Sequence, residues 1–214
     1  MTDDRPPNKR QMQAAATRER MLHAAREVFE QRGYRAATVG AITSAADTAH
    51  GTFYLYFKNK DDAFAQVMTS VGTELRDAQR SDPANDRWQG IESALRAFLD
   101  VFVRHPGLWR ALLEGMLLSP AIEQMWLEIR ARFVDQLAGG LEREQGRGVV
   151  RALDTRQTAL AMASMAEWYS FTHLVLGAEH STDKGIDVAV ETLTDVWYHA
   201  AYGTTDRTRP AASS

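Results

Sequence analysis

Apolar side chains recur along this chain at the spacing of an α-helix, and this periodicity restricts the fold more than any other feature. One example is the stripe within residues 17–32 formed by Met21, Ala24, Ala25, Val28 and Phe29. Clean alternation of apolar and polar residues, the pattern of a half-buried strand, is missing, and helix formers dominate throughout. The sequence therefore predicts an all-α fold.

Glycines, prolines and capping residues divide the pattern into nine predicted helices. They cover residues 17–32, 39–46, 49–56, 60–80, 87–104, 108–118, 121–144, 155–176 and 185–202. Thr38, Asn59 and Asp154 are predicted N-caps, and Gly33 is predicted to end the first helix. We expect a flexible arm over residues 1–16, domains over residues 17–60 and 61–203, and a flexible tail over residues 204–214.

The charge is distributed unevenly between the two expected domains. Residues 1–62 carry 10 Lys or Arg and 8 Asp or Glu, whereas residues 63–214 carry 15 and 20. This asymmetry indicates two functional halves with the basic one first, although an ordinary solvated surface would also explain it. The longest uncharged stretch is about 11 residues, against the roughly 18 of a membrane span, so no membrane partner is expected.

The chain has no cysteine, which excludes disulfides, thiolate metal sites and a cysteine nucleophile. Residues 1–10 carry charges and two prolines where the apolar part of a secretory signal would begin. The six histidines show no metal-ligand spacing, and GxGxxG, P-loop, HExxH and GxSxG motifs are missing. We therefore expect a cytoplasmic protein that is not an enzyme and has neither a cofactor nor a metal.

Three predicted helices fall within the first 57 residues, and a tight turn joins the two short ones, as in a helix-turn-helix. On the third helix, one face would pack on the first two helices through Ala49, Phe53 and Phe57. The opposite side carries no permanent charge, unlike an ordinary solvated helix, and consists of His50, Gly51, Thr52, Tyr54 and Leu55.

Two residues of this region have unusual positions. Gly51 costs about 1 kcal/mol relative to alanine inside a helix, which either a closely approaching DNA backbone or a neighbouring helix would explain. Lys60 lies in the first turn of the fourth predicted helix, where the helix dipole disfavours a cation. A bound phosphate would remove that conflict, and a side chain that extends into water would also reduce it.

The segment from Thr38 to Asp62 resembles the DNA-binding signature of TetR-family transcriptional regulators. The specific part is the string Gly51-Thr52-Phe53-Tyr54-x-Tyr56-Phe57-x-Asn59-Lys60. The resemblance implies a nine-helix architecture with an N-terminal three-helix helix-turn-helix domain and a C-terminal helical domain for ligand binding and dimerisation. It also implies a homodimer whose third helices enter successive major grooves of a pseudo-palindromic operator in double-stranded DNA.

Carried onto this chain, the signature assigns DNA contacts to Thr38, His50, Gly51, Thr52, Tyr54, Tyr56 and Lys60. Further backbone contacts are expected from Lys9 and Arg10 in the arm. The chain departs from the family pattern at three positions. Asp47 replaces the usual turn glycine, Ala49 a frequent serine, and Leu55 a common polar or basic residue.

The resemblance also implies that the second domain is a sensor. Bulky side chains with one carboxylate are candidates for an adaptable pocket: Trp109, Met116, Met125, Trp126, Phe133, Met165, Glu167, Trp168 and Phe171. Solid core or a dimer interface would also explain the apolar members, and an ion pair or exposure on the far face would explain Glu167 or Glu114. Candidates for the dimer interface are Val188, Leu193, Val196, Trp197 and Ala200.

The string Val196-Trp197-x-x-Ala200-Ala201-Tyr202-Gly203 is similar to the ending of actinobacterial TetR regulators with elongated lipophilic pockets. It favours an apolar small-molecule effector that releases a repressor from its operator. Two alternatives remain open. One is a ligand-sequestering helical dimer with a degenerate DNA head, and the other is a regulator of the same fold without a small-molecule effector.

Overall fold

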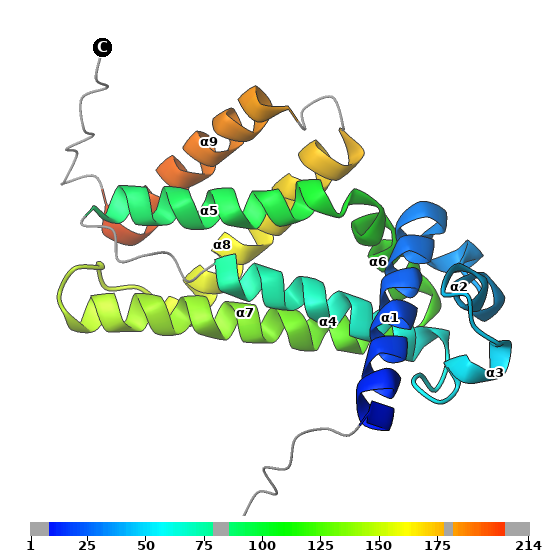
Figure 1. The fold of residues 1–214 in the computed structure, drawn as a ribbon. Helices are drawn as coiled ribbons and strands as arrows, with labels where there is room; N and C mark the ends of the chain where they lie inside the picture. The colour runs from blue at the N-terminus through cyan, green and yellow to red at the C-terminus, as the bar shows by residue number, and fades with distance from the viewer. Residues whose placement is uncertain (1–8, 79–85, 178–181, 204–214) are drawn as a thin grey trace, which may run out of the picture. The chain divides into compact units, whose positions relative to one another are not determined.

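The computed structural model describes residues 9–78, 86–177 and 182–203. Within these ranges the chain forms nine α-helices, one π-helical segment and no strand (Figure 1). The predicted all-α fold with nine helices is therefore confirmed. The predicted tail and residues 1–8 of the predicted arm lie outside the described residues. In the part of the chain that is described, no helix has both the length and the apolar character needed to cross a bilayer.

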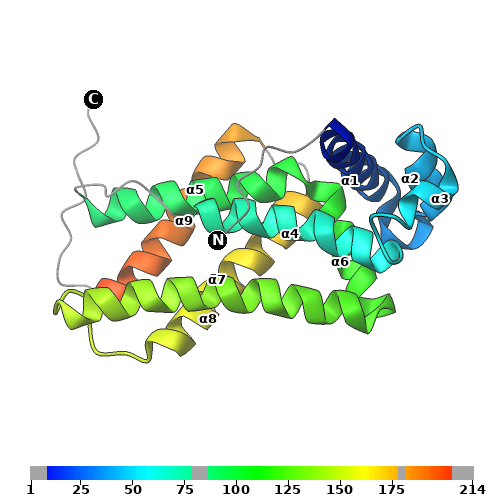
Figure 2. The ribbon, with the colours of Figure 1, turned by 60° about the horizontal axis from the view of Figure 1, so that its bottom comes forward.

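The chain divides into two compact units. The first contains residues up to 71 together with residues 105–126, and the second contains residues 72–104 and those from 127 onwards. The first unit holds α1 (Lys9–Ala36), α2 (Val39–Ala45), α3 (His50–Phe53), the start of α4 (Lys60–Ala78), α6 (Pro106–Leu118) and the start of α7 (Pro120–Gly146). The second holds the rest of α4 and α7, with α5 (Arg87–Arg104), α8 (Thr155–Ser170), the π-helical η1 (Phe171–Leu176) and α9 (Asp183–Tyr202) (Figure 2). The functional boundary between residues 60 and 61 stays a prediction.

The core of the first unit is aromatic. The ring centroids of Phe29 and Phe64 lie 4.7 Å apart, and those of Phe53 and Phe57 lie 5.1 Å apart. The predicted burial of Phe53 and Phe57 is confirmed. The predicted burial of Ala49 is wrong, because Ala49 is the extended residue before α3 and its side chain is exposed.

Two helices of the first unit differ in length from the prediction by four residues or more. The first begins at Lys9, so residues 9–16 of the predicted arm are helical. Its helical backbone is interrupted at Gly33, where φ is +74°, as the predicted helix end requires. Helix α3 has only four residues, because the N–H groups of Leu55 and Tyr56 bond to carbonyls three residues back and tighten the chain into a turn.

The three predicted N-caps are confirmed. Oγ1 of Thr38 accepts the N–H of Ala41 at 3.1 Å, Oδ1 of Asn59 accepts the N–H of Asp62 at 2.8 Å, and Oδ1 of Asp154 accepts the N–H of Gln157 at 2.9 Å. Each contact satisfies a backbone donor that the first turn of a helix leaves unpaired.

Helices α1 and α6 are joined by two glutamate side chains, one from each helix, that accept backbone N–H groups of the other helix. Glu30 of α1 accepts the N–H groups of Gly107 and Leu108 at 2.7 and 2.9 Å, which caps the start of α6. Glu114 of α6 accepts the N–H of Arg35 at 3.0 Å, beside the kink at Gly33. Glu114 therefore provides a hydrogen-bond acceptor for the backbone near the C-terminal end of α1.

In the second unit, α9 runs along α5. The rings of Trp88 and Tyr198 lie 5.4 Å apart, and Arg96 forms a 2.7 Å ion pair with Asp187. Helix α7 packs on α5 where Phe133 meets Phe98 at 5.4 Å. These contacts join α5 to both α7 and α9.

Candidate functional site

The turn between α2 and α3 depends on Asp47. Its φ of +50° is the one left-handed backbone angle among the described non-glycine residues. Aspartate tolerates this region better than most residues, which explains how it can stand at a turn position that favours glycine. The departure from the family pattern at Asp47 therefore leaves the helix-turn-helix geometry intact.

The outer face of the segment from α3 to Leu55 is exposed and carries no permanent charge. Tyr54 is 55% and Leu55 76% exposed, and the side chain of His50 is exposed as well. The rings of His50 and Tyr54 lie 5.7 Å apart, so they form one continuous surface. Thr52 is half-buried at its edge. This face presents aromatic and hydrogen-bonding groups to the solvent, which suits the edges of bases.

Gly51 lies in the middle of this face. A Cβ atom added there would meet nothing within 4 Å in the described chain. The interpretation that Gly51 makes room for a neighbouring helix is therefore wrong. The free space belongs to the outside of the molecule, where a DNA backbone can approach.

Thr38 and Tyr56 are the two predicted phosphate ligands that carry a hydroxyl group. Because the hydroxyl of Thr38 accepts the N–H of Ala41, its own proton remains available to a further acceptor such as a phosphate oxygen. The side chain of Thr38 is exposed and that of Tyr56 is half-buried.

Lys60 is held inside the first unit. Its Nζ donates to the backbone oxygen of Tyr34 at 2.9 Å and lies 4.3 Å from the centroid of the Tyr34 ring. An ammonium group has three N–H donors, so two remain for a second ligand. The side chain is thus fixed in position, which neither sequence interpretation anticipated.

A polar cluster beside Lys60 was missed by the sequence analysis. The hydroxyl of Tyr34 donates to Asp61, and Oγ of Ser119 donates to the other carboxylate oxygen at 2.6 Å. Burial and the hydrogen bond to Asp61 raise the pKa of the Tyr34 phenol. These residues are far apart in sequence and fall in different predicted elements, so no local pattern indicated the cluster.

The candidate pocket residues fall into two groups. Trp109, Met116, Met125 and Trp126 belong to the first unit, where the two tryptophan rings meet edge to face at 5.7 Å. The other five belong to the second unit. Phe133 and Phe171 are buried there, Met165 is half-buried, and Trp168 is 63% exposed while stacking on Phe171.

Glu167 forms an ion pair. Its Oε2 accepts Nε of Arg130 at 2.7 Å, and the same guanidinium donates to Oγ of Ser164 at 2.6 Å. Burial raises the pKa of the Glu167 carboxyl, and the hydrogen bond and charge of Arg130 oppose that rise. Among the alternatives for Glu167, the ion pair is the one present.

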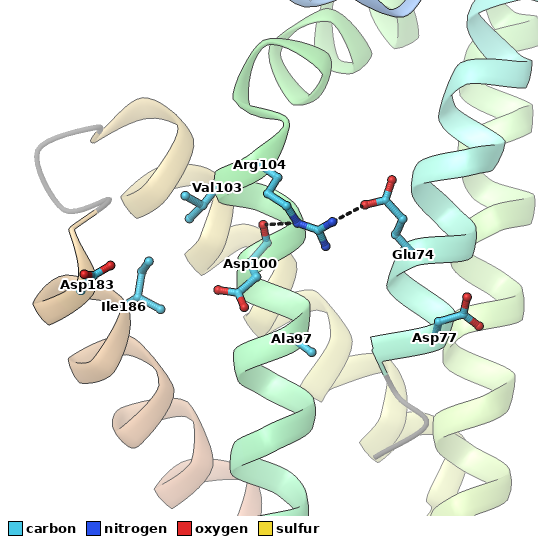
Figure 3. A pocket seen from close by; sticks show the side chains of 8 residues that line it. All are labelled: Glu74, Asp77, Ala97, Asp100, Val103, Arg104, Asp183 and Ile186. Atoms are coloured by element: carbon cyan, nitrogen blue, oxygen red, sulfur yellow. Dashed lines mark hydrogen bonds and ion pairs between the residues drawn. The ribbon is translucent and has the colours of Figure 1, made fainter. Parts of the chain in front are cut away.

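An open cavity of about 550 Å³ in the second unit is lined by none of the predicted residues. Figure 3 shows its lining on both sides of α5: Glu74, Asp77, Ala97, Asp100, Val103, Arg104, Asp183 and Ile186. Four of these are carboxylates, and Arg104 pairs with Glu74 at 3.0 Å. The described residues contain no cluster of potential metal ligands.

The candidate dimer residues differ in burial. Val188 and Val196 are exposed on α9, and Ala200 is half-buried. Leu193 and Trp197 are 2% and 7% exposed and pack inside the chain.

Comparisons with known proteins cover both units. The profile of the bacterial regulatory proteins of the tetR family matches residues 21–67, and that of the C-terminal domain of the transcriptional regulator EthR matches residues 91–203. The HTH-type regulator YhgD of Bacillus subtilis is 24% identical over 152 residues, which are 68% of this chain and 78% of YhgD. The HTH-type transcriptional repressor SCO4008 of Streptomyces coelicolor is 28% identical over 155 residues, which are 72% of this chain and 78% of the repressor.

The fold agrees with these matches. A TetR-family regulator of Mesorhizobium loti superposes with a TM-score of 0.71 at 16% identity, over 88% of this chain and 98% of the other. One profile accounts for the helix-turn-helix and the other for more than half of the chain. The chain belongs to the TetR family of DNA-binding transcriptional regulators.

Proposed function

We propose that this regulator is a homodimeric repressor, that each protomer reads one half of a pseudo-palindromic operator with the face around Gly51, and that a lipophilic small molecule releases it. The observation that carries the proposal is the open space over Gly51 within an exposed, uncharged surface. Glycine lowers helix stability, and no neighbouring atom of the described chain requires its small size at position 51. Close approach of a DNA backbone explains why a glycine stands there.

In this proposal, contacts to bases and contacts to phosphates come from different residues. His50, Thr52 and Tyr54 reach base edges or the adjacent backbone, where imidazole and hydroxyl groups offer both donors and acceptors. Thr38 and Tyr56 donate hydroxyl protons to phosphates, and Lys60 contributes its remaining N–H donors. Because α3 has no permanent cation, the reading face adds little to the salt dependence.

We propose that the dimer forms through the exposed apolar side chains of α8 and α9. Leu160, Trp168, Val188 and Val196 are exposed there, and Leu193 and Trp197 would support this surface from beneath. Replacing both Val188 and Val196 by aspartate is expected to give monomers by sedimentation with unchanged helicity. A dimer that persists would refute this interface.

The effector site is proposed in the second unit, next to Phe133, Met165 and Phe171, with the Arg130–Glu167 pair as its polar end. The first-unit candidates Trp109, Met116, Met125 and Trp126 would then form core packing beside the DNA head. No catalytic step and no cofactor belongs to this proposal.

The decisive experiment selects binding sites from a random duplex pool with the full-length protein. Recovery of an inverted repeat, bound by wild type and lost with Tyr54→Ala, is the expected result. Tyr54→Phe keeps the ring and removes the hydroxyl group, so it shows which part of the side chain makes the contact. An unenriched pool with weak, salt-driven binding would refute operator reading and favour the ligand-sequestering dimer. Release of the selected duplex by lipophilic compounds, followed by fluorescence anisotropy, tests the effector.

A further inference from the structure

Three buried polar side chains of the second unit have no hydrogen-bond partner among the described residues. They are the hydroxyl groups of Ser170 in α8 and Thr194 in α9, and the indole N–H of Trp197 in α9. Ser170 and Thr194 are fully buried, and Trp197 is 7% exposed. Since buried polar groups in folded proteins are nearly always hydrogen-bonded, each of these groups requires an explanation.

The two hydroxyl groups differ from other hydroxyl groups of the same helices. Oγ of Ser164 donates to the backbone oxygen four residues back at 2.7 Å, and Oγ1 of Thr192 does the same at 2.8 Å. This bond is a common way for a helix to satisfy serine and threonine. Neither Ser170 nor Thr194 forms it in the described chain, so their hydroxyl protons remain for another acceptor.

The three groups lie in the interior of the second unit. Thr194 and Trp197 are three residues apart in α9, so they are neighbours on one face of that helix. Ser170 is the last residue of α8, which packs against α9, and α5 packs against α9 and against the segment that follows Ser170. Because the groups are buried within a single chain, a partner protomer at the proposed dimer surface would not reach them.

The backbone changes its helix type directly after Ser170. From Phe171 to Leu176 it is π-helical, in the segment η1, and three side chains of this segment are buried. A π-helical turn is rare and is often found at functional sites. An unpartnered hydroxyl group and an irregular backbone therefore occur together at the end of α8.

The chemistry of the three groups favours a neutral oxygen acceptor as their ligand. An indole N–H can only donate, and both hydroxyl groups have a proton to donate. The cation next to them is already in use, because Arg130 pairs with Glu167, one turn before Ser170, at 2.7 Å. A carboxylate would lose its water without gaining a cation, whereas a carbonyl oxygen of a ketone, ester or amide would not incur that cost.

We propose that Ser170, Thr194 and Trp197 donate hydrogen bonds to neutral oxygen acceptors of the effector. The effector is then a lipophilic ketone, ester or amide, and neither a hydrocarbon nor a carboxylate. Since the three groups are closed to solvent in the free chain, the side chains around them move apart when the effector enters. This inference rests on the proposed effector binding and adds to it the chemical class of the effector.

The test uses pairs of neutral probes that share one shape and differ in the acceptor. Diphenyl ketone and undecyl methyl ketone are each compared with the alkene in which a methylene group replaces the oxygen, and dodecanoate is the anionic probe. Isothermal titration calorimetry with the full-length protein gives each Kd. At least one ketone is expected to bind about tenfold or more tightly than its alkene and than dodecanoate, because a site built for a hydrogen bond discriminates against an analogue that lacks it.

Variants show whether the named hydroxyl groups cause this preference. Thr194→Val and Ser170→Ala are each expected to bind the ketone at least about fivefold more weakly and the alkene unchanged. Without a probe, both variants should have a higher Tm than wild type, because a buried hydroxyl group without a partner is removed. Thr194→Ser keeps the hydroxyl group and should keep the preference. The matched control is Thr69→Val in α4, an exposed residue whose hydroxyl donates to the backbone oxygen of Ala65 at 2.7 Å, and it should bind both probes like wild type.

The outcomes separate this inference from the proposed effector binding. Alkenes that bind as tightly as the ketones and release the operator would overturn the inference and leave effector binding intact. An operator that none of the probes releases would count against both. A lower Tm for Thr194→Val with unchanged ketone affinity would show that a trapped water satisfies the hydroxyl group, and the inference would fall. Tighter binding of dodecanoate than of undecyl methyl ketone would overturn the neutral class of the ligand.

Discussion

Replacing Gly51 by alanine is expected to change protein stability and DNA affinity in opposite directions. In the free chain the new methyl group would meet nothing within 4 Å. Alanine is the better helix former by about 0.5–1 kcal/mol, so the free energy of unfolding should rise by that amount or less. For a chain of this size, each 1 kcal/mol corresponds to a rise in Tm of about 2–4 °C.

On the operator, the same methyl group would occupy the space that the proposal assigns to the DNA backbone. The duplex must then move away, or the reading face must tilt. Because each protomer carries one Gly51, the loss of affinity occurs at both halves of the operator. We expect the Kd to rise at least about tenfold, which equals about 1.4 kcal/mol. Because the two effects have opposite signs, loss of folding cannot be mistaken for loss of contact.

The matched control is Gly140→Ala in α7, where the nearest atom to an added Cβ is Nη2 of Arg143 at 4.0 Å. It makes the same chemical change inside a helix of the second unit, and it should raise stability without changing Kd. Thermal unfolding and fluorescence anisotropy measure the two quantities. An unchanged Kd for Gly51→Ala would refute close approach of DNA at Gly51, and a lower Tm would refute the open space.

Three further predictions follow from contacts inside the two units. Because the pKa of Glu167 is raised in the folded protein, its contribution to stability is present at low pH and is lost as pH rises above the ordinary carboxyl value of 4.5. In urea unfolding, the free energy of unfolding of wild type should show this decline with pH. Glu167→Gln should lack this contribution, and Arg130→Met should show a steeper decline. Parallel curves of unfolding free energy against pH for the three proteins would contradict the prediction. Tyr34→Phe removes a hydrogen bond to the carboxylate of Asp61 and should lower the free energy of unfolding by about 1.5–3 kcal/mol in urea titrations; no loss would show that the bond contributes nothing net. Asp47→Ala should lose about 1 kcal/mol at φ +50°, whereas Asp47→Gly should be tolerated, and equal Tm values for the two variants would count against strain at this turn.

Local patterns were enough to predict much of the helix-turn-helix segment. The caps at Thr38 and Asn59 and the core positions of Phe53 and Phe57 depend on residues within one or two turns, so spacing reveals them. The length of α3 was not predictable in the same way. The helix ends early because the N–H groups of Leu55 and Tyr56 bond to carbonyls three residues back, and residue spacing does not reveal this choice of acceptor.

Contacts between distant residues could not be predicted from the sequence. Glu30 bonds to an N–H 77 residues away and Glu114 to one 79 residues away, and the packing of α1 on α6 alone brings them together. The exposure of Trp168 has a similar origin. A bulky aromatic residue in an apolar run is usually buried, and only the packing of α8 shows which side faces solvent.

The contacts also show which unusual residues of the first unit are explained by other residues of the chain and which are not. Gly33 and Glu114 account for each other, because a Cβ at Gly33 would lie 2.8 Å from the Glu114 carboxylate, so neither needs a ligand. Lys60 is accounted for in part, since the oxygen and ring of Tyr34 take up one side of its ammonium group. Nothing inside the described chain accounts for Gly51. A glycine that weakens its helix and fills no need within the protein is therefore the residue whose replacement tests the DNA contact most directly.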